Sequence, residues 1–223
     1  MKKIPTLFER QFEGHKIVGI TDKLTDPSFQ CVLDGECAMT IKFDGSCCAV
    51  IDWIFYKRFD AKPGRKIPDG AIPCCDPDPI TGHHPHWVAV NANNAGDKWF
   101  IEALKTTVGS TTPGGSFVVL DDGHIETNIP DGTYEAVGKH FNGNPYALKG
   151  DKLIRHGCVT VSLKEKTLTF ELLRGILETE NVEGFVFWKD GEPLCKIKKT
   201  DFGFEWPIPD VMNGHVLNEW PRF

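Results

Sequence analysis

Short apolar runs with the character of β-strands recur along the chain and constrain what it can fold into. Each run is rich in Val, Ile, Phe or Trp, or alternates apolar with polar residues, and most are bounded by Gly, Pro, Asp or Asn, as strands and turns usually are. The runs that we expect to form strands are residues 15–20, 37–41, 47–56, 87–90, 116–120, 133–138, 158–163, 182–188 and 193–197. The sequence therefore predicts a fold dominated by β-sheets.

Helical spacing is clear in one place. Leucine and isoleucine recur at intervals of three and four between Leu168 and Leu177, with acidic residues on the opposite side, which predicts an amphipathic helix over about 167–180. Residues 97–107 mix apolar and charged side chains, so a short helix and a strand are both open there. Sheets with a few helices indicate the α+β class.

Two Asp-Gly pairs are typical of tight turns between strands. Asp44-Gly45 lies between two apolar runs and predicts a hairpin, and Asp190-Gly191 predicts another near the end of the chain. Residues 62–86 are rich in proline and glycine, which indicates a long loop-rich insertion over a functional cleft. Trp53 and Trp87 stand in strand contexts, so we expect both in the core.

The length of 223 residues and the apolar content of 40% permit one large domain or a core with a small appendage. We take the simpler hypothesis, a single domain over 1–223 with a short extension at 201–223 that is too small to fold alone. No apolar stretch approaches the roughly 20 residues needed to cross a bilayer, and the beginning of the chain is unlike a secretory signal. We expect a soluble protein, monomeric and without a membrane partner.

The cysteines indicate a reducing compartment. Of the eight, four form the adjacent pairs Cys47-Cys48 and Cys74-Cys75, and adjacent cysteines rarely bridge each other. We therefore expect a cytoplasmic protein. The loop at 74–86 also holds three histidines, but its spacing fits no standard zinc pattern.

The formal net charge of −6 would argue against nucleic acid if it were evenly spread, but basic residues cluster at 139–155 and 189–199. Local basic patches are therefore better evidence on nucleic-acid binding than the net charge is. The cluster between residues 139 and 156 is a candidate for contact with RNA phosphates, with a solvated basic face as the alternative. Its candidate RNA-binding residues are Lys139, His140, Lys149, Lys152, Arg155 and His156.

A lysine before an Asp-Gly turn is the most suggestive chemical feature. Lys42-Phe43-Asp44-Gly45 alone arises easily by chance, and a strand that ends in a turn is then the better explanation. What favours function is the ordered sequence of charged residues that follows it, which comprises Glu135, Glu183, Lys196 and Lys198.

These residue types suit attack on an activated phosphorus. A neutral lysine amine is a good nucleophile, but an ordinary pKa of about 10.4 keeps it protonated at neutral pH. Lys196 and Lys198 alternate on a predicted strand and so share a face, where their charge would lower the pKa of Lys42 and hold phosphate. Burying Glu135 or Glu183 would require a partner such as a ribose hydroxyl or a hydrated metal ion.

In this order the residues resemble the motifs of covalent nucleotidyltransferases, the polynucleotide ligases and messenger-RNA capping guanylyltransferases. Residues 42–45 resemble motif I, Glu135 with Gly138 motif III, Glu183-Gly184 motif IV and 196–198 motif V, and Arg58 matches the arginine after motif I in ligases. Further segments resemble the small ATP-dependent 5′-to-3′ RNA ligases found in vertebrates, namely Cys47-Cys48, 82–88, 141–146 and 155–157.

The resemblance implies an α+β nucleotidyltransferase fold, with antiparallel sheets flanked by helices and no OB-fold domain. It also implies ATP and Mg²⁺ (or Mn²⁺) as cofactors, and as substrate RNA with 5′-phosphate and 3′-hydroxyl ends, joined during RNA repair. Lys42 would form lysyl-AMP and pass the AMP to the RNA 5′-phosphate, which a 3′-hydroxyl then attacks. Two other hypotheses stay open, an inactive fold that binds nucleotide or RNA ends and, less favoured for want of the capping domain, a capping-type guanylyltransferase.

The resemblance also assigns roles to single residues. Arg58 and Glu135 would contact the ribose, and Lys196 and Lys198 the α-phosphate. Glu183 would position the metal ion through water. Phe141 would stack on adenine, with Tyr146 as its rival.

Overall fold

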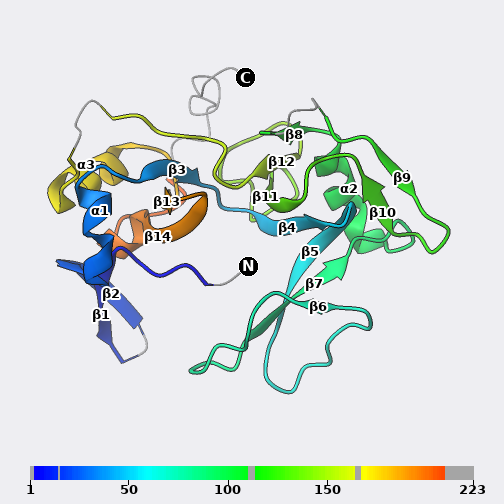
Figure 1. Ribbon diagram of the computed structural model, residues 1–223, viewed down its shortest axis with the longest axis horizontal. Helices are drawn as coiled ribbons and strands as arrows, with labels where there is room; N and C mark the ends of the chain where they lie inside the picture. Colours follow the sequence, from blue (N-terminus) through cyan, green and yellow to red (C-terminus); the bar gives the residue numbers. More distant parts are fainter. Residues whose placement is uncertain (1–2, 15, 110–113, 164–166, 209–223) are drawn as a thin grey trace. The chain divides into compact units, whose positions relative to one another are not determined.

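The computed structural model describes residues 3–14, 16–109, 114–163 and 167–208 (Figure 1). The chain divides into two compact units, which are considered one at a time below. Unit 1 contains residues 44–156, and unit 2 contains residues 3–43 together with the part of the chain from Gly157 on. Mixed and antiparallel sheets with few helices confirm the α+β class.

Unit 1 is built on one sheet whose strand order is β6-β7-β5-β4-β11-β12-β8, with β10 pairing with both β5 and β9. All pairs are antiparallel except β8 with β12. The strands are β4 (Ser46–Ile51), β5 (Ile54–Ala61), β6 (Ile72–Pro73), β7 (His84–Ala89), β8 (Thr107–Val108), β9 (Phe117–Val119), β10 (Ile125–Thr127), β11 (Gly132–Val137) and β12 (Lys152–Arg155).

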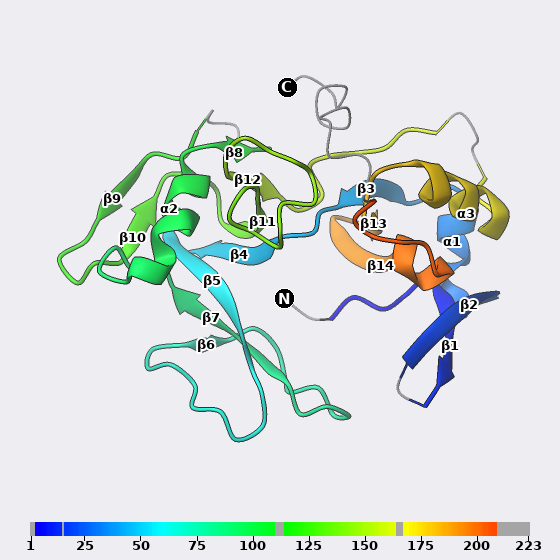
Figure 2. The same ribbon diagram turned by 180° about the vertical axis from the view of Figure 1, so that it is seen from behind.

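A short helix packs on this sheet beside β11 and β12 (Figure 2). The 3-10 turn η2 (Ala95–Asp97) leads into α2 (Lys98–Leu104), which confirms the helical alternative for this stretch. Leu104 of α2 and Tyr134 and Leu153 of the sheet are fully buried in one hydrophobic core. This core fixes β4 and β11, the strands that carry Cys47 and Glu135.

Unit 2 contains a three-stranded antiparallel sheet in the order β14-β13-β3 and a separate hairpin, β1-β2. Leu173 and Leu177 of α3 are fully buried with Phe187 and Ile197 of the sheet, so the apolar face of the predicted helix covers it (Figure 1). The elements are β1 (Phe8–Glu13), β2 (Lys16–Leu24), η1 (Pro27–Phe29), α1 (Gln30–Leu33), β3 (Ala38–Lys42), α3 (Phe170–Thr179), β13 (Gly184–Lys189), β14 (Glu192–Lys198) and η3 (Lys199–Phe202).

The predicted hairpin at Asp44-Gly45 is wrong. β3 pairs with β13, whereas β4 pairs with β5 and β11, so the strands on either side of Asp44-Gly45 belong to different sheets. The real hairpin joins β4 to β5 through Asp52 and Trp53, whose φ angles are +50° and +67°. The Asp131 carboxylate accepts hydrogen bonds from both backbone N–H groups of this turn, at 3.0 and 3.3 Å, and thereby supports an unusual conformation without glycine.

Two smaller predictions also need correction. Trp53 is 57% exposed because it lies in that turn, although Trp87 is buried as expected. Residues 158–163 form no regular strand, but Val159 and Val161 make backbone hydrogen bonds of 3.0 and 2.8 Å to β3. The predicted hairpin at Asp190-Gly191 is confirmed as β13-β14.

Most of residues 62–83 has no regular secondary structure apart from β6. The predicted extension at 201–223 is described only as far as 208, and the rest lies outside the described residues. Within the described parts of the chain, no helix is long and apolar enough to cross a membrane.

Candidate active site

Lys42 is the last residue of β3 and lies directly beside β13, the central strand of its sheet. Gly184 of β13 is the register partner of Lys42 on one side and of Lys198 on the other. The Nζ of Lys42 forms an ion pair with the Glu183 carboxylate, and Glu183 is only 8% exposed. A Cβ at position 184 would clash with the Ile197 carbonyl oxygen, so glycine permits this close strand approach.

The two predicted lysines of β14 join this group. Lys196 and Lys198 alternate along the strand and are both half-buried. Burial, followed by the positive charges of Lys42, Arg10 and Lys198, lowers the pKa of Lys196 to about 8, although Glu183 opposes this shift. Unit 2 thus gathers four of the predicted residues into one cluster, hereafter the lysine cluster: Lys42, Glu183, Lys196 and Lys198.

An arginine and an aspartate support the lysine cluster. Arg10 of β1 forms a 2.7 Å ion pair with Asp201, whose side chain is 1% exposed. The second oxygen of Asp201 accepts a 2.8 Å hydrogen bond from the backbone N–H of Lys198. The pair therefore fixes the end of β14, where the cluster lies. Neither residue was expected from the sequence, because their pairing joins positions 191 residues apart.

Glu135 lies in unit 1, on β11, and both of its carboxylate oxygens have partners. Oε1 accepts a 3.0 Å hydrogen bond from the backbone N–H of Gly45, and Oε2 lies 2.9 Å from Nε2 of His156. A Cβ at Gly45 would clash with the carbonyl oxygen of Ala136. The Asp-Gly pair is thus explained by close packing on β11 rather than by a hairpin turn.

The loop that follows β11 holds the residues after Lys42. The side-chain amide of Asn142 donates to Asp44 Oδ1 at 2.9 Å and to the Gly45 carbonyl at 2.7 Å. The Tyr146 hydroxyl accepts a 2.6 Å hydrogen bond from the Asp44 backbone. Phe141 is 4% exposed and packs edge-on against a neighbouring phenylalanine of the core, so it would have to leave the core to stack on a base.

Arg58, on β5, forms a 2.8 Å ion pair with Asp60. Burial disfavours its charge, but Asp60, together with the nearby Cys47 and Cys74, outweighs burial and raises the pKa of Arg58. The nearby Cys47, on β4, is a thiol whose pKa is raised to about 12 by burial and then by the charge of Glu135.

The predicted RNA-binding residues have unequal surroundings. Lys139 and Lys149 are exposed, whereas Lys152 and Arg155 are half-buried on β12. Arg155 donates a 3.3 Å hydrogen bond to a backbone carbonyl. Their role in RNA binding stays a prediction.

The histidines of the basic cluster already have partners inside unit 1. His140 stacks on Trp99, with ring centroids 3.4 Å apart, and contacts Asp151 at 2.6 Å. His156 lies between Glu135 and Thr133. Its position next to a glutamate depends on strand register, which the sequence alone did not reveal.

Comparison with known proteins places the sequence in a family. The sequence model of RNA ligase 1 matches residues 51–218, which is more than half of the chain. The chain belongs to the RNA ligase 1 family. The match begins after Lys42, but it includes Arg58, Glu135, Glu183, Lys196 and Lys198.

Curated members of the RNA ligase 1 family occur in several vertebrates. The chain is 29% identical to RNA ligase 1 of Pongo abelii over 173 residues, 26% identical to that of Danio rerio over 177 and 29% identical to that of Rattus norvegicus over 180. In each case the match covers 71% of this chain and 50% of the relative. The chain therefore spans about half the length of these relatives.

Proposed function

We propose that the chain is an ATP-dependent RNA ligase whose Lys42 accepts AMP from ATP. The observation that carries the proposal is the lysine cluster, in which an amine at a strand end lies beside a buried carboxylate and two further amines. Membership of the RNA ligase 1 family supports the same class of reaction. The proposal includes the specific fold of the covalent nucleotidyltransferases for this chain.

In the first step the Lys42 amine, after losing a proton, attacks the α-phosphorus of ATP. A nitrogen–phosphorus bond forms, the bond from the α-phosphorus to the bridging oxygen breaks, and pyrophosphate leaves. Lys196, with a pKa of about 8, is mostly protonated at neutral pH and stabilises the negative charge on the phosphate. Lys198 adds to this field from the same strand.

The surroundings of Glu183 fit a magnesium ion bound together with nucleotide phosphates. Mg²⁺ prefers oxygen ligands and is usually held by one or two carboxylates plus substrate phosphates and water. Glu183 supplies a poorly exposed carboxylate next to the attacking amine. When bound, the ion would neutralise charge on the phosphates, and Mn²⁺ would serve the same purpose.

In the later steps the AMP passes from Lys42 to an RNA 5′-phosphate, and a 3′-hydroxyl then displaces AMP to join the strands. Exposed Lys139 and Lys149 are suited to phosphate contact, and half-buried Lys152 and Arg155 on β12 are further candidates. The contacts of Arg58 and Glu135 with the ribose, and of Phe141 or Tyr146 with adenine, stay predictions.

Labelling with nucleotide tests the proposal. The protein is incubated with Mg²⁺ and either α-³²P-labelled ATP or α-³²P-labelled GTP, and then with a nicked RNA that has 5′-phosphate and 3′-hydroxyl ends. We expect covalent label from ATP, followed by sealing of the RNA. Label from GTP alone would identify a capping-type guanylyltransferase, and no label with either nucleotide would leave an inactive binding fold.

A further inference from the structure

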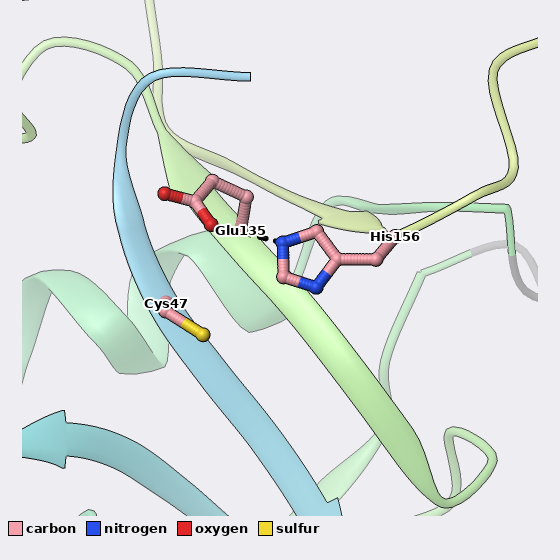
Figure 3. A group of neighbouring side chains, drawn as sticks. All are labelled: Cys47, Glu135 and His156. Atoms are coloured by element: carbon pink, nitrogen blue, oxygen red, sulfur yellow. Dashed lines mark hydrogen bonds and ion pairs between the residues drawn. The ribbon is translucent and has the colours of Figure 1, made fainter. Parts of the chain in front are cut away.

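Cys47, Glu135 and His156 bring a sulfur, an oxygen and a nitrogen donor together in unit 1. Figure 3 shows the three side chains on neighbouring strands, with the His156 ring facing the Glu135 carboxylate. Their ligand atoms all lie within 4.8 Å of one another, and all three residues are half-buried. The proposed lysine chemistry uses neither Cys47 nor His156.

Strand register creates this arrangement. Cys47 of β4 and Glu135 of β11 are direct partners in the antiparallel ladder, so their side chains lie on the same face of the sheet. His156 follows the last residue of β12, and its backbone N–H donates a 3.0 Å hydrogen bond to the Thr133 carbonyl. Three neighbouring strands of one sheet, β4, β11 and β12, therefore position the three donors, with His156 directly after the end of β12.

Two of the donors are also oriented by a second layer of partners. Thr133 Oγ1 lies 2.9 Å from Nδ1 of His156, and the Gly45 backbone N–H donates to Glu135 Oε1 at 3.0 Å. If Nδ1–H donates to Thr133, Nε2 keeps its lone pair as a metal ligand, and it lies beside Glu135 Oε2, the carboxylate oxygen that Gly45 does not hold. Outer partners of this kind fix the tautomer and orientation of metal-binding histidines.

We propose that Cys47, Glu135 and His156 bind one borderline-soft transition-metal ion of the Zn²⁺ class. Hard cations such as Mg²⁺ and Ca²⁺ favour oxygen donors, whereas a mixed set of thiolate, imidazole and carboxylate suits zinc. Three protein ligands with an open fourth position are typical of zinc sites that keep a water or another exchangeable ligand.

The nitrogen–oxygen distance needs little adjustment for such an ion. Zinc bonds of about 2.0 Å to oxygen and nitrogen, at tetrahedral angles, place those two atoms roughly 3.3 Å apart. Nε2 of His156 and Oε2 of Glu135 are now 2.9 Å apart, so they would separate by only a few tenths of an ångström. The Cys47 thiol would lose its proton to solvent as the metal–sulfur bond forms.

Among the residues that the structure describes, Arg58 carries a nearby charge that opposes the cation. The positive charge of Arg58 acts on Cys47, but Arg58 is already paired with Asp60 at 2.8 Å. A Cys47 thiolate and the Glu135 carboxylate together carry two negative charges, which exceed the single charge of the guanidinium. Binding of this metal does not depend on the proposed ligase activity.

Titration of the metal-free full chain with Co²⁺ tests the proposal, because cobalt replaces zinc in such sites and reports thiolate ligation by a charge-transfer absorption band. We expect one strongly bound Co²⁺ per chain with this band, displaced by Zn²⁺ but not by excess Mg²⁺. Cys47→Ser should abolish the band, and His156→Gln should weaken binding at least about tenfold.

The matched control is Cys31→Ser, because the sulfurs of Cys31 and Cys37 lie 3.5 Å apart and offer two thiols outside the proposed site. This variant should keep the band and the affinity of the wild type. Thr133→Val, which removes only the outer partner of His156, should weaken binding by about tenfold and keep the band. Absence of strong binding, a band that persists in Cys47→Ser, or loss of the band in Cys31→Ser would overturn the proposal, provided that circular dichroism shows the variants folded.

Discussion

Lys196 lies half-buried among the positive charges of Lys42, Arg10 and Lys198, which together with burial lower its pKa to about 8. If its charge stabilises the α-phosphate, adenylylation should weaken as the pH rises through about 8, because the charged form is then lost. Lys196→Arg stays charged throughout this range, so its rate should show no such decline at alkaline pH.

The measurement is the rate of lysyl-AMP formation between pH 6.5 and 9.5, with Lys189→Arg on the neighbouring strand as control. A decline above pH 8 that is identical in wild type and Lys196→Arg would contradict the assigned role.

The lowered pKa of Lys196 also affects the stability of the fold. Between about pH 8 and 10.5 the unfolded chain binds more protons at Lys196 than the folded chain, so this residue raises the free energy of unfolding as the pH increases through that window.

Glu183 is the second residue whose role can be measured separately. Glu183→Gln keeps the size of the side chain but removes the charge that pairs with Lys42 and fits a metal ion. We expect the rate of lysyl-AMP formation to fall by about 10²-fold, the loss typical of an electrostatic contact in an active site.

Glu192→Gln is the matched control, because Glu192 is exposed at the start of β14 and should be neutral. Titration with Mg²⁺ shows whether part of the loss is recovered at high metal concentration. A Glu183→Gln rate within about twofold of the wild type would rule out an electrostatic role of the size assumed here.

At the residue scale the sequence located Lys42, Glu183, Lys196 and Lys198, because each stands in a short motif that strand pairing then brings together. It did not locate Arg10 or Asp201, or associate Cys47 and His156 with Glu135. Those contacts depend on which strands become neighbours, and no local pattern records this. For Phe141, the position in a motif did not reveal that the ring is buried.

At the element scale, α3 shows how local sequence specifies a helix. The Thr169 hydroxyl accepts a 3.1 Å hydrogen bond from the Leu172 N–H and caps the first turn. Thr169→Ala should lower the free energy of unfolding by about 1 kcal/mol, whereas Thr169→Ser should keep the cap and be nearly neutral. Chemical denaturation followed by circular dichroism measures both variants.

The same helix offers a stabilising change. Gly175 lies in the middle of the helix on its exposed side, and nothing lies within 4 Å of a Cβ built there. Gly175→Ala should raise the free energy of unfolding by up to about 1 kcal/mol, because alanine loses less backbone freedom on folding. A destabilised Gly175→Ala, in the same denaturation assay, would contradict the helix as described.

Hairpins were harder to place than helices from the sequence. Asp44-Gly45 has the expected turn residues but joins two sheets, while Asp52-Trp53 lacks glycine and forms the real turn. The Asp131 carboxylate, far along the chain, supports that turn. The Asp-Gly pairs thus predicted the β13-β14 hairpin correctly but misplaced the first hairpin. At the real turn, the distant Asp131 side chain stabilises a conformation that glycine usually adopts.

At the scale of the whole molecule, the apolar runs and the one helical periodicity predicted the α+β class, and the family resemblance predicted the reaction class. Each unit has its own hydrophobic core, around Phe187 in one and Tyr134 in the other. Composition could not locate either core, because forming them depends on pairing between distant segments. The net charge of −6 was equally uninformative about function, since the lysine cluster is a local concentration of positive charge.

The most direct test is the intact mass of the protein after incubation with ATP and Mg²⁺. The wild type should gain the mass of one AMP, and Lys42→Arg should gain none, since arginine can keep the ion pair with Glu183 but is not a nucleophile at neutral pH. Lys189→Arg should react like the wild type. An unmodified wild type, or an AMP adduct that persists in Lys42→Arg, would contradict the assignment of Lys42 as the nucleophile.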